Sequence, residues 1–173
     1  MKDLMVDIET LGTGRNAVIT QIGACYFDRN TGEVGDTFLV NIRIQDCLDN
    51  GLEVDAGAIK FWFDQEHRDF LEAPVDLTKA LGQFKQFCKK GTIAWAHATF
   101  DFPIIANAYK VIKQGMPFPY RGMRDIRTLV DLSNVEYKKY KRIGTHHNAL
   151  DDCINQVTYC SACFQALKGE KNV

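Results

Sequence analysis

The sequence lacks the features that would direct a protein into a membrane or along the secretory route. No apolar run reaches about 18 residues, which is the minimum for a candidate transmembrane helix. The first residues lead directly into an apolar stretch, without the basic and apolar regions of a signal peptide. We therefore expect a cytoplasmic protein with no membrane partner.

An excess of charge of either sign is also missing. The formal net charge is −1, which argues against a strongly basic nucleic-acid clamp. This balance does not exclude a nucleic acid as substrate, because bound cations can neutralise phosphate groups locally.

Disulfide-scaffold spacing, internal repeats and low-complexity linkers are absent as well. The chain has 6 cysteines. Cys160 and Cys163 form a C-x-x-C in an apolar helical stretch, and no second pair completes a zinc site, so we predict that they pack in the core. The length of 173 residues, with 46% hydrophobic and 25% charged residues, predicts a single domain over residues 1–173.

Three apolar segments in series, with short connections, predict antiparallel strands. The first begins at residue 3, the second covers 17–28 and the third covers 36–44. Further elements follow from apolar periodicity: helices at 57–73, 76–90, 100–115, 124–133 and 148–168, a strand at 92–97, and a loop at 134–147. The predicted fold class is α/β, with a mixed sheet flanked by helices: antiparallel in its first three strands and parallel thereafter.

Two carboxylates interrupt the first apolar strand. Asp7 and Glu9 stand two residues apart in the segment DLMVDIETLGTG. Successive side chains of a strand alternate between faces, so both carboxylates point the same way. Like charges near a core are costly unless something positive joins them. The strand therefore predicts a positively charged partner for the two carboxylates.

Three other polar residues are candidates for the same site. Asp101 stands where the predicted strand 92–97 gives way to a helix, and an N-cap role would explain it equally well. His147 and Asp152 lie five residues apart near the start of the last predicted helix. Taken alone, they also fit an exposed loop histidine and an acidic residue favoured by the helix dipole.

The combination is more specific than its parts. Asp7, Glu9, Asp101 and Asp152 are hard oxygen donors at positions where an α/β sheet can gather them. Oxygen ligands suit Mg²⁺ or Mn²⁺ rather than zinc. Two such ions can stabilise the attacking and leaving oxygens of phosphodiester cleavage. His147 could then accept the proton of the attacking water. We predict a site for two Mg²⁺ (or Mn²⁺) ions.

These motifs resemble those of the DEDDh 3′–5′ exonucleases of the RNase H-like superfamily. The series is D-x-E at 7 and 9, F-D at 100 and 101, and H-x-x-x-x-D from 147 to 152. It runs in the family's order over nearly the whole chain. The segments DIETLGTG, WAHATFD, RDIRTLVD and HNALDD are most similar to the branch of exonuclease VIII-like and small bacterial or phage exoribonuclease domains. The resemblance implies an RNase H-like fold.

The resemblance also implies roles for the site residues. His147 would be the general base, and a histidine rather than a tyrosine there assigns the DEDDh subgroup. His146 and Asp151 fall outside the family's register. The implied metal ligands are Asp7, Glu9, Asp101 and Asp152.

The implied activity is a metal-dependent 3′–5′ exonuclease that releases nucleoside 5′-monophosphates. Its substrate would be single-stranded or 3′-overhang RNA or DNA, with RNA favoured, and relatives are often homodimers. One departure stands out: Ala96-His97-Ala98 replaces the asparagine that many relatives carry shortly before F-D. This changes the expected substrate contacts but not the metal ligands.

Candidate substrate contacts rest on the same resemblance. Relatives seat the 3′-terminal nucleotide on the residues equivalent to Thr10, Leu11 and Gly12, whereas the alternative is a strand-ending turn with Leu11 in the core. Trp62 lies on a helix with apolar spacing that favours core packing, and stacking on a base is the alternative. Phe100 is the remaining candidate.

The segment YKKYKR at 137–142 is either a flap that follows the phosphates or a solvated charged loop. Two other functions stay open from the sequence. One is an endonuclease on the same scaffold, which would cut a circular strand. The other is a non-catalytic nucleic-acid or partner-binding module that keeps the acidic residues for structural cation binding.

Overall fold

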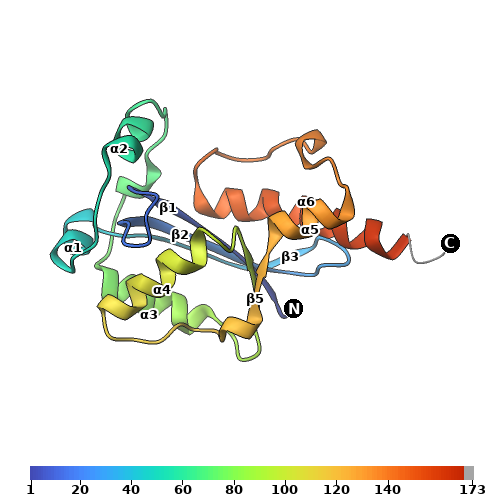
Figure 1. Cartoon of the computed structure of the whole chain (residues 1–173), viewed down its shortest axis with the longest axis horizontal. Coiled ribbons are helices and arrows are strands. Elements are labelled where there is room, and N and C mark those ends of the chain that lie inside the picture. Colours follow the sequence, from blue (N-terminus) through green and yellow to red (C-terminus); the bar gives the residue numbers. More distant parts are fainter. Residues whose placement is uncertain (170–173) are drawn as a thin grey trace.

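The computed structural model describes residues 1–169, and a five-stranded sheet forms its centre (Figure 1). The strands, in the spatial order β3-β2-β1-β4-β5, are β1 (Asp3–Thr10), β2 (Ile19–Phe27), β3 (Val34–Asn41), β4 (Ile93–Ala96) and β5 (Met123–Asp125). β2 pairs antiparallel with β1 and with β3, whereas β4 runs parallel to β1 and to β5. The predicted mixed sheet is confirmed. The last four residues of the predicted domain lie outside the described residues.

Helices cover both faces of the sheet. They are α1 (Ile44–Asp49), α2 (Ala56–Phe63), α3 (Leu77–Phe87), α4 (Asp101–Val111), α5 (Ile126–Ser133) and α6 (Ala149–Gly169). Figure 1 shows α5 and α6 on one face, and α3 and α4 on the other. Within the described part of the chain, no helix combines the length and apolar character that a membrane crossing requires.

The alternation of side chains along β1 assigns its residues to two cores. Leu4 and Val6 belong to the apolar cluster that includes α3 and α4. Met5 belongs to the cluster formed with α5 and α6, together with Cys160 and Cys163. Asp7 and Glu9 share the parity of Met5 and therefore face α6.

The N-terminus of α6 lies directly against β2 at Gly23, which stands opposite Asp7 in the strand register. A Cβ at position 23 would overlap the backbone of Ala149 and Leu150. Two residues earlier, the Gln21 Oε1 accepts a hydrogen bond of 2.7 Å from the Ala149 N–H. The missing side chain at Gly23 thus allows the first turn of α6 to approach Asp7.

The helix predicted at 57–73 is shorter in the structure and ends at Phe63. Arg68 terminates it by donating hydrogen bonds to the carbonyl oxygens of Trp62 and Phe63, at 3.0 and 2.8 Å. Phe70 then packs edge-on against Trp62, with ring centroids 4.7 Å apart. The prediction was wrong beyond Phe63 because apolar periodicity does not reveal a cap supplied by a side chain of the following loop.

The strand predicted at 36–44 is also shorter, and it ends at Asn41. The chain then enters α1, which was not predicted. Asp46 in α1 accepts a hydrogen bond of 2.7 Å from the backbone N–H of Leu77 at the start of α3. This long-range contact accounts for a helix of only 6 residues, too short for periodicity to show.

The start of the helix predicted at 124–133 belongs to β5 in the structure. Asp125 closes this three-residue strand and caps α5 by accepting a hydrogen bond of 2.8 Å from the Thr128 N–H. The segment predicted as loop at 134–147 is irregular apart from one 3₁₀ turn, Tyr137–Lys139.

The contact at Gly23 leads to a test. Gly23→Ala should lower the free energy of unfolding by roughly 1–3 kcal/mol, because the added methyl group must displace the backbone of α6. Gly82→Ala is the matched control, since Gly82 lies inside α3 and a Cβ there would meet no described atom within 4 Å beyond its chain neighbours and its own helix backbone. That change should raise the free energy of unfolding by about 0.5–1 kcal/mol. Urea titrations measure both, and equal effects of the two changes would contradict the packing.

Candidate active site

Carboxylates that are far apart in the sequence meet beside the start of α6. Asp7 and Glu9 come from β1, Asp101 is the first residue of α4, and Asp152 lies in the first turn of α6. Asp7, Glu9 and Asp101 are only 8%, 7% and 1% exposed. The structure therefore brings the predicted ligand set to one cleft, which all of them line together with His147.

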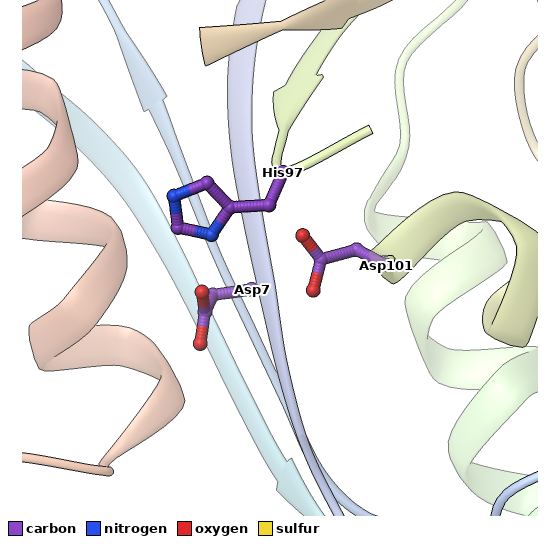
Figure 2. A group of neighbouring side chains, drawn as sticks. All are labelled: Asp7, His97 and Asp101. Atoms are coloured by element: carbon purple, nitrogen blue, oxygen red, sulfur yellow. The ribbon is translucent and has the colours of Figure 1, made fainter. Parts of the chain in front are cut away.

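The carboxylates divide into two groups, each with a histidine. In the first group, one ligand atom from each of Asp7, His97 and Asp101 lies within 4.8 Å of the other two. Figure 2 shows the three side chains, from β1, the end of β4 and the start of α4, directed toward one another. In the second group, Glu9, His147 and Asp152 meet the same distance limit.

Backbone hydrogen bonds hold the turn that presents the first group. The carbonyl oxygen of His97 accepts from the N–H groups of Phe100 and Asp101, at 2.8 and 3.0 Å. The next residue, Ala98, donates its N–H to the Asp125 carboxylate at 3.0 Å. The end of β4 is thereby tied to the start of both α4 and α5, which limits the positions that His97 and Asp101 can take.

Aromatic rings surround the imidazole of His147. Its ring meets Phe61 edge-on with centroids 4.9 Å apart, lies 5.8 Å from Trp62, and stacks on His146 at 3.9 Å. The Nδ1 atom lies 4.0 Å from the Glu9 carboxylate. The backbone at His147 has a positive φ of 62°, a conformation that costs energy for a side chain with a Cβ.

Two side chains of α6 hold the loop that leads to His147. Asp151 accepts a hydrogen bond of 2.7 Å from the Thr145 N–H. Asn155 accepts one of 2.8 Å from the Ile143 N–H. Asp151, which the family register leaves out of the metal set, is thus in a position to fix this loop.

The burial of the acidic residues disfavours their charged forms. Burial raises the pKa of Asp7, although a hydrogen bond from Gln156 acts in the opposite direction. Burial also raises the pKa of Glu9 and Asp101, and repulsion from Asp7 adds to both shifts. Carboxylates held in this way are stabilised by any cation that enters the cleft.

Among the described residues, an arginine forms an ion pair with only one carboxylate of this acidic cluster. Arg142 forms an ion pair with Asp152. Asp7 accepts a hydrogen bond of 2.7 Å from the amide of Gln156. The Oδ2 atom of Asp101 is buried and has no hydrogen-bond partner among the described residues.

Both histidines of the cluster are held neutral. Burial, with repulsion from His146 and Arg142, lowers the pKa of His147 to about 4. Burial, with repulsion from Arg127, lowers the pKa of His97 to about 4. At neutral pH, each imidazole therefore keeps a nitrogen lone pair that can accept a proton or bind a metal.

The donor set fits divalent cations. Four carboxylates supply the oxygen ligands that Mg²⁺ and Mn²⁺ favour, and the unpartnered Asp101 oxygen is a buried acceptor without a donor. Buried polar atoms of this kind normally have a partner. A cation between the carboxylates would provide one.

The cleft has a volume of about 880 Å³, at the upper end of the usual range for ligand sites. One wall carries tyrosine and basic side chains from the segment between α5 and α6, which extends away from the sheet in Figure 1 before it returns to the start of α6. These residues are Tyr137, Lys138, Tyr140, Lys141 and Arg142.

The predicted substrate contacts lie in different places. Phe100 lines the cleft. Trp62 is only 5% exposed and donates its indole N–H to the Thr10 carbonyl oxygen at 2.8 Å. It therefore supports β1 and the neighbouring His147 ring from the buried side. Leu11 packs in the core, and Gly12 lies against Asp55 at the start of α2. Contacts of these residues with a substrate stay predictions.

Residue-by-residue reasoning missed two members of the site. Gln156 is one helical turn from Asp152, so the spacing i, i+4 on α6 placed it on the same face. His97 carried only an indirect signal, because it lies in the segment Ala96-His97-Ala98 that the resemblance marks as a departure. Its proximity to Asp7 depends on the pairing of β1 with β4, which the sequence does not specify.

Comparison with known families identifies the chain. A family model described as the 3′-5′ exoribonuclease Rv2179c-like domain matches residues 2–164. The chain belongs to this family. Among curated proteins, no sequence matches it. As a member of an exoribonuclease family, the domain is an enzyme of the hydrolase class, and a nucleic acid is its class of substrate.

Solved structures agree with the fold. Exonuclease I from Methylocaldum szegediense is 13% identical with a TM-score of 0.68, over 94% of this chain and 40% of that one. Exonuclease I from E. coli, in complex with a 5cy-dA13 oligonucleotide, is 15% identical with a TM-score of 0.63, over 96% and 40%. Exonuclease X in complex with 5′ overhanging duplex DNA is 15% identical with a TM-score of 0.62, over 94% and 91%.

The exoribonuclease domain thus spans less than half the length of the exonuclease I chains and nearly all of the exonuclease X chain. At these identities, the likeness shows the fold alone. The predicted RNase H-like exonuclease fold is confirmed.

The raised pKa values predict that the metal-free domain loses stability as pH rises. Below the ordinary histidine pKa of about 6.5, the lowered pKa values of His97 and His147 act in the opposite direction. Above it, the folded state binds more protons than the unfolded state, so the free energy of unfolding falls with pH. We expect the urea midpoint in EDTA to fall between about pH 7 and pH 9, the range in which folded Asp7 and Glu9 lose their protons. Saturating Mg²⁺ should reverse most of the loss, because the cation replaces the protons.

Asp101→Asn is the matched variant for this measurement, because it keeps the side-chain shape and removes one ionisable group. Its midpoint should depend less on pH than that of the wild type. A wild-type midpoint in EDTA that stays flat or rises over this range would contradict the account.

The Arg142–Asp152 ion pair predicts competition with metal. Arg142→Ala should tighten Mg²⁺ binding several-fold in the absence of nucleic acid, since a partly exposed pair contributes at most about 1 kcal/mol. Arg142→Lys keeps the charge and should bind Mg²⁺ nearly as the wild type does. Lys139→Ala removes a positive charge of the segment 137–142 that pairs with Glu136 instead. It controls for a general electrostatic effect on Mg²⁺ binding. Calorimetric titration measures all four proteins, and weaker Mg²⁺ binding by Arg142→Ala would refute the competition.

Proposed function

We propose that residues 1–173 act as one exonuclease domain that hydrolyses the terminal phosphodiester bond at the 3′ end of a nucleic-acid strand. The products would be nucleoside 5′-monophosphates. The observation that carries the proposal is the convergence of Asp7, Glu9, Asp101 and Asp152 on one cleft beside His147. The activity would require Mg²⁺ or Mn²⁺, two ions per site.

The two groups of ligands suggest how the carboxylates share this task. Asp7 and Asp101 would hold one cation, and Glu9 and Asp152 the other, in keeping with the distances within each group. When bound, such a pair of cations stabilises the charge that develops on the attacking and leaving oxygens. Gln156 orients Asp7 through its 2.7 Å hydrogen bond and leaves the second carboxylate oxygen for a ligand role.

His147 is the proposed general base. It belongs to the Glu9 and Asp152 group, and its lowered pKa leaves the imidazole unprotonated at neutral pH. A neutral ring nitrogen can accept the proton of a water that attacks the terminal phosphorus. Phe61 and Trp62 restrict the ring on one side, and Asp151 and Asn155 restrain the loop that carries it.

The tyrosine and basic wall supports binding of a single strand. Lysine and arginine side chains can follow the phosphates, while Tyr137, Tyr140 and Phe100 offer faces on which bases can stack. Such a surface suits a single-stranded or 3′-overhanging end, whose bases are free to unstack. The family description favours RNA over DNA as the substrate.

A cleavage assay tests this proposal. Two strands of the same sequence, one RNA and one DNA, carry a label at the 5′ end and are incubated with Mg²⁺, Mn²⁺ or EDTA. We expect a ladder that shortens from the 3′ end with either metal, faster on RNA, and no cleavage in EDTA. Asp7→Asn should abolish the ladder, and His147→Ala should slow it by roughly 10²–10⁴-fold, the usual contribution of a general base.

His67→Ala is the control, because His67 is exposed on the loop that follows α2 and should leave the rate unchanged. A labelled circular strand should remain intact, and its cleavage would favour an endonuclease. A full rate for His147→Ala would refute the assignment of the base. Failure of every linear strand to shorten would refute the exonuclease itself.

A further inference from the structure

His97 is the member of the cluster to which the four-carboxylate scheme gives no role. It follows β4 directly and stands four residues before Asp101. Its half-buried ring lines the cleft with Asp7 and Asp101, and Figure 2 shows the imidazole near both side chains.

The distances are those of a preformed ligand group. One nitrogen of His97 and one oxygen from each of Asp7 and Asp101 lie within 4.8 Å of one another. Ligand atoms on a single small cation, at roughly 2.1 Å from the metal, stand about 3–4 Å apart. Small side-chain rotations would therefore close the group around one ion.

A cation would stabilise the buried negative charges of this group. Asp7 and Asp101 are almost completely buried, and the Asp101 Oδ2 atom has no partner among the described residues. No ion pair reaches either carboxylate in residues 1–169, whereas Arg142 already pairs with Asp152 in the neighbouring group. The first group thus combines two buried carboxylates and an imidazole, and no ion pair to either carboxylate is present among the described residues.

The backbone keeps the imidazole in this position. Two N–H groups of the following turn bond to the His97 carbonyl oxygen, and Ala98 is tied to Asp125. A ring anchored in this way can ligate a metal with little loss of conformational freedom, which is how metal sites on rigid elements gain affinity.

We propose that His97 is a third protein ligand of the cation held by Asp7 and Asp101, and that this position prefers Mn²⁺ to Mg²⁺. The inference rests on the proposed function, because it assumes that the same carboxylates bind a cation. Its chemical basis is the donor set: Mg²⁺ favours oxygen ligands alone, whereas an imidazole nitrogen suits transition metals.

Pulsed electron paramagnetic resonance of the Mn²⁺-loaded full chain tests the inference directly, because it detects a nitrogen nucleus bound to the metal. The measurement uses the His147→Ala protein, which removes the histidine of the second group. We expect an imidazole coupling in His147→Ala and its loss in the His97→Ala, His147→Ala double variant. Absence of the coupling in the first protein, or its persistence in the second, would overturn the assignment of His97.

Calorimetric titration provides the second readout, with His97→Ala and the exposed His67→Ala as a matched pair. His97→Ala should weaken Mn²⁺ binding by about tenfold or more and Mg²⁺ binding by less than about threefold, since nitrogen ligation matters mainly for the transition metal. His67→Ala should change neither. Equal losses for both metals would contradict the proposed preference.

These measurements distinguish failure of the exonuclease proposal from failure of the proposed His97 ligand. If the wild-type chain binds neither metal, both the exonuclease proposal and the role of His97 are refuted. If Mn²⁺ binds without a nitrogen coupling, only the role of His97 is refuted. Should His97→Ala fail to fold by circular dichroism, His97→Asn, which retains a polar side chain of similar size, replaces it in both measurements.

Discussion

Carboxylates that are buried close together lose their hydration and repel one another, and this electrostatic cost dominates the cleft. Asp7, Glu9 and Asp101 are nearly inaccessible to water, and the one arginine paired to the described cluster reaches Asp152. Protons or divalent cations must offset the remaining charge. The same constraint explains why the pKa values of the buried carboxyls are raised and why the site suits a metal-dependent hydrolase.

The fold produces this concentration of charge through a few close contacts. Gly23 lies opposite Asp7 and has no side chain. The first turn of α6 can therefore approach the sheet there and bring Asp152 to β1. Parallel pairing of β4 with β1 brings the turn at His97 and Asp101 to the same end of the sheet. Because these contacts join segments separated by more than 80 residues in the chain, packing energy from both cores supports the site.

Much of this arrangement could be predicted from residue patterns. The spacing of Asp7 and Glu9 shows that they share one face of β1, and the motifs around Asp101 and Asp152 predict the other candidate ligands. The division into two groups could not be predicted, because it depends on strand register and on the approach of α6 at Gly23. Side-chain contacts that periodicity does not reveal explain the errors in the fold: Arg68 ends α2 early through a local contact, and Asp46 stabilises the unpredicted α1 against α3 over a long range.

The central claim is that the buried carboxylates form a site for two divalent cations. A crystal structure of the Mn²⁺-soaked protein, with anomalous scattering recorded for manganese, tests this claim most directly. The account predicts two anomalous peaks, one between Asp7 and Asp101 and one between Glu9 and Asp152, with Arg142 moved away from Asp152. An electron-density map without manganese in the cleft, and with the Arg142–Asp152 pair intact at saturating Mn²⁺, would contradict it.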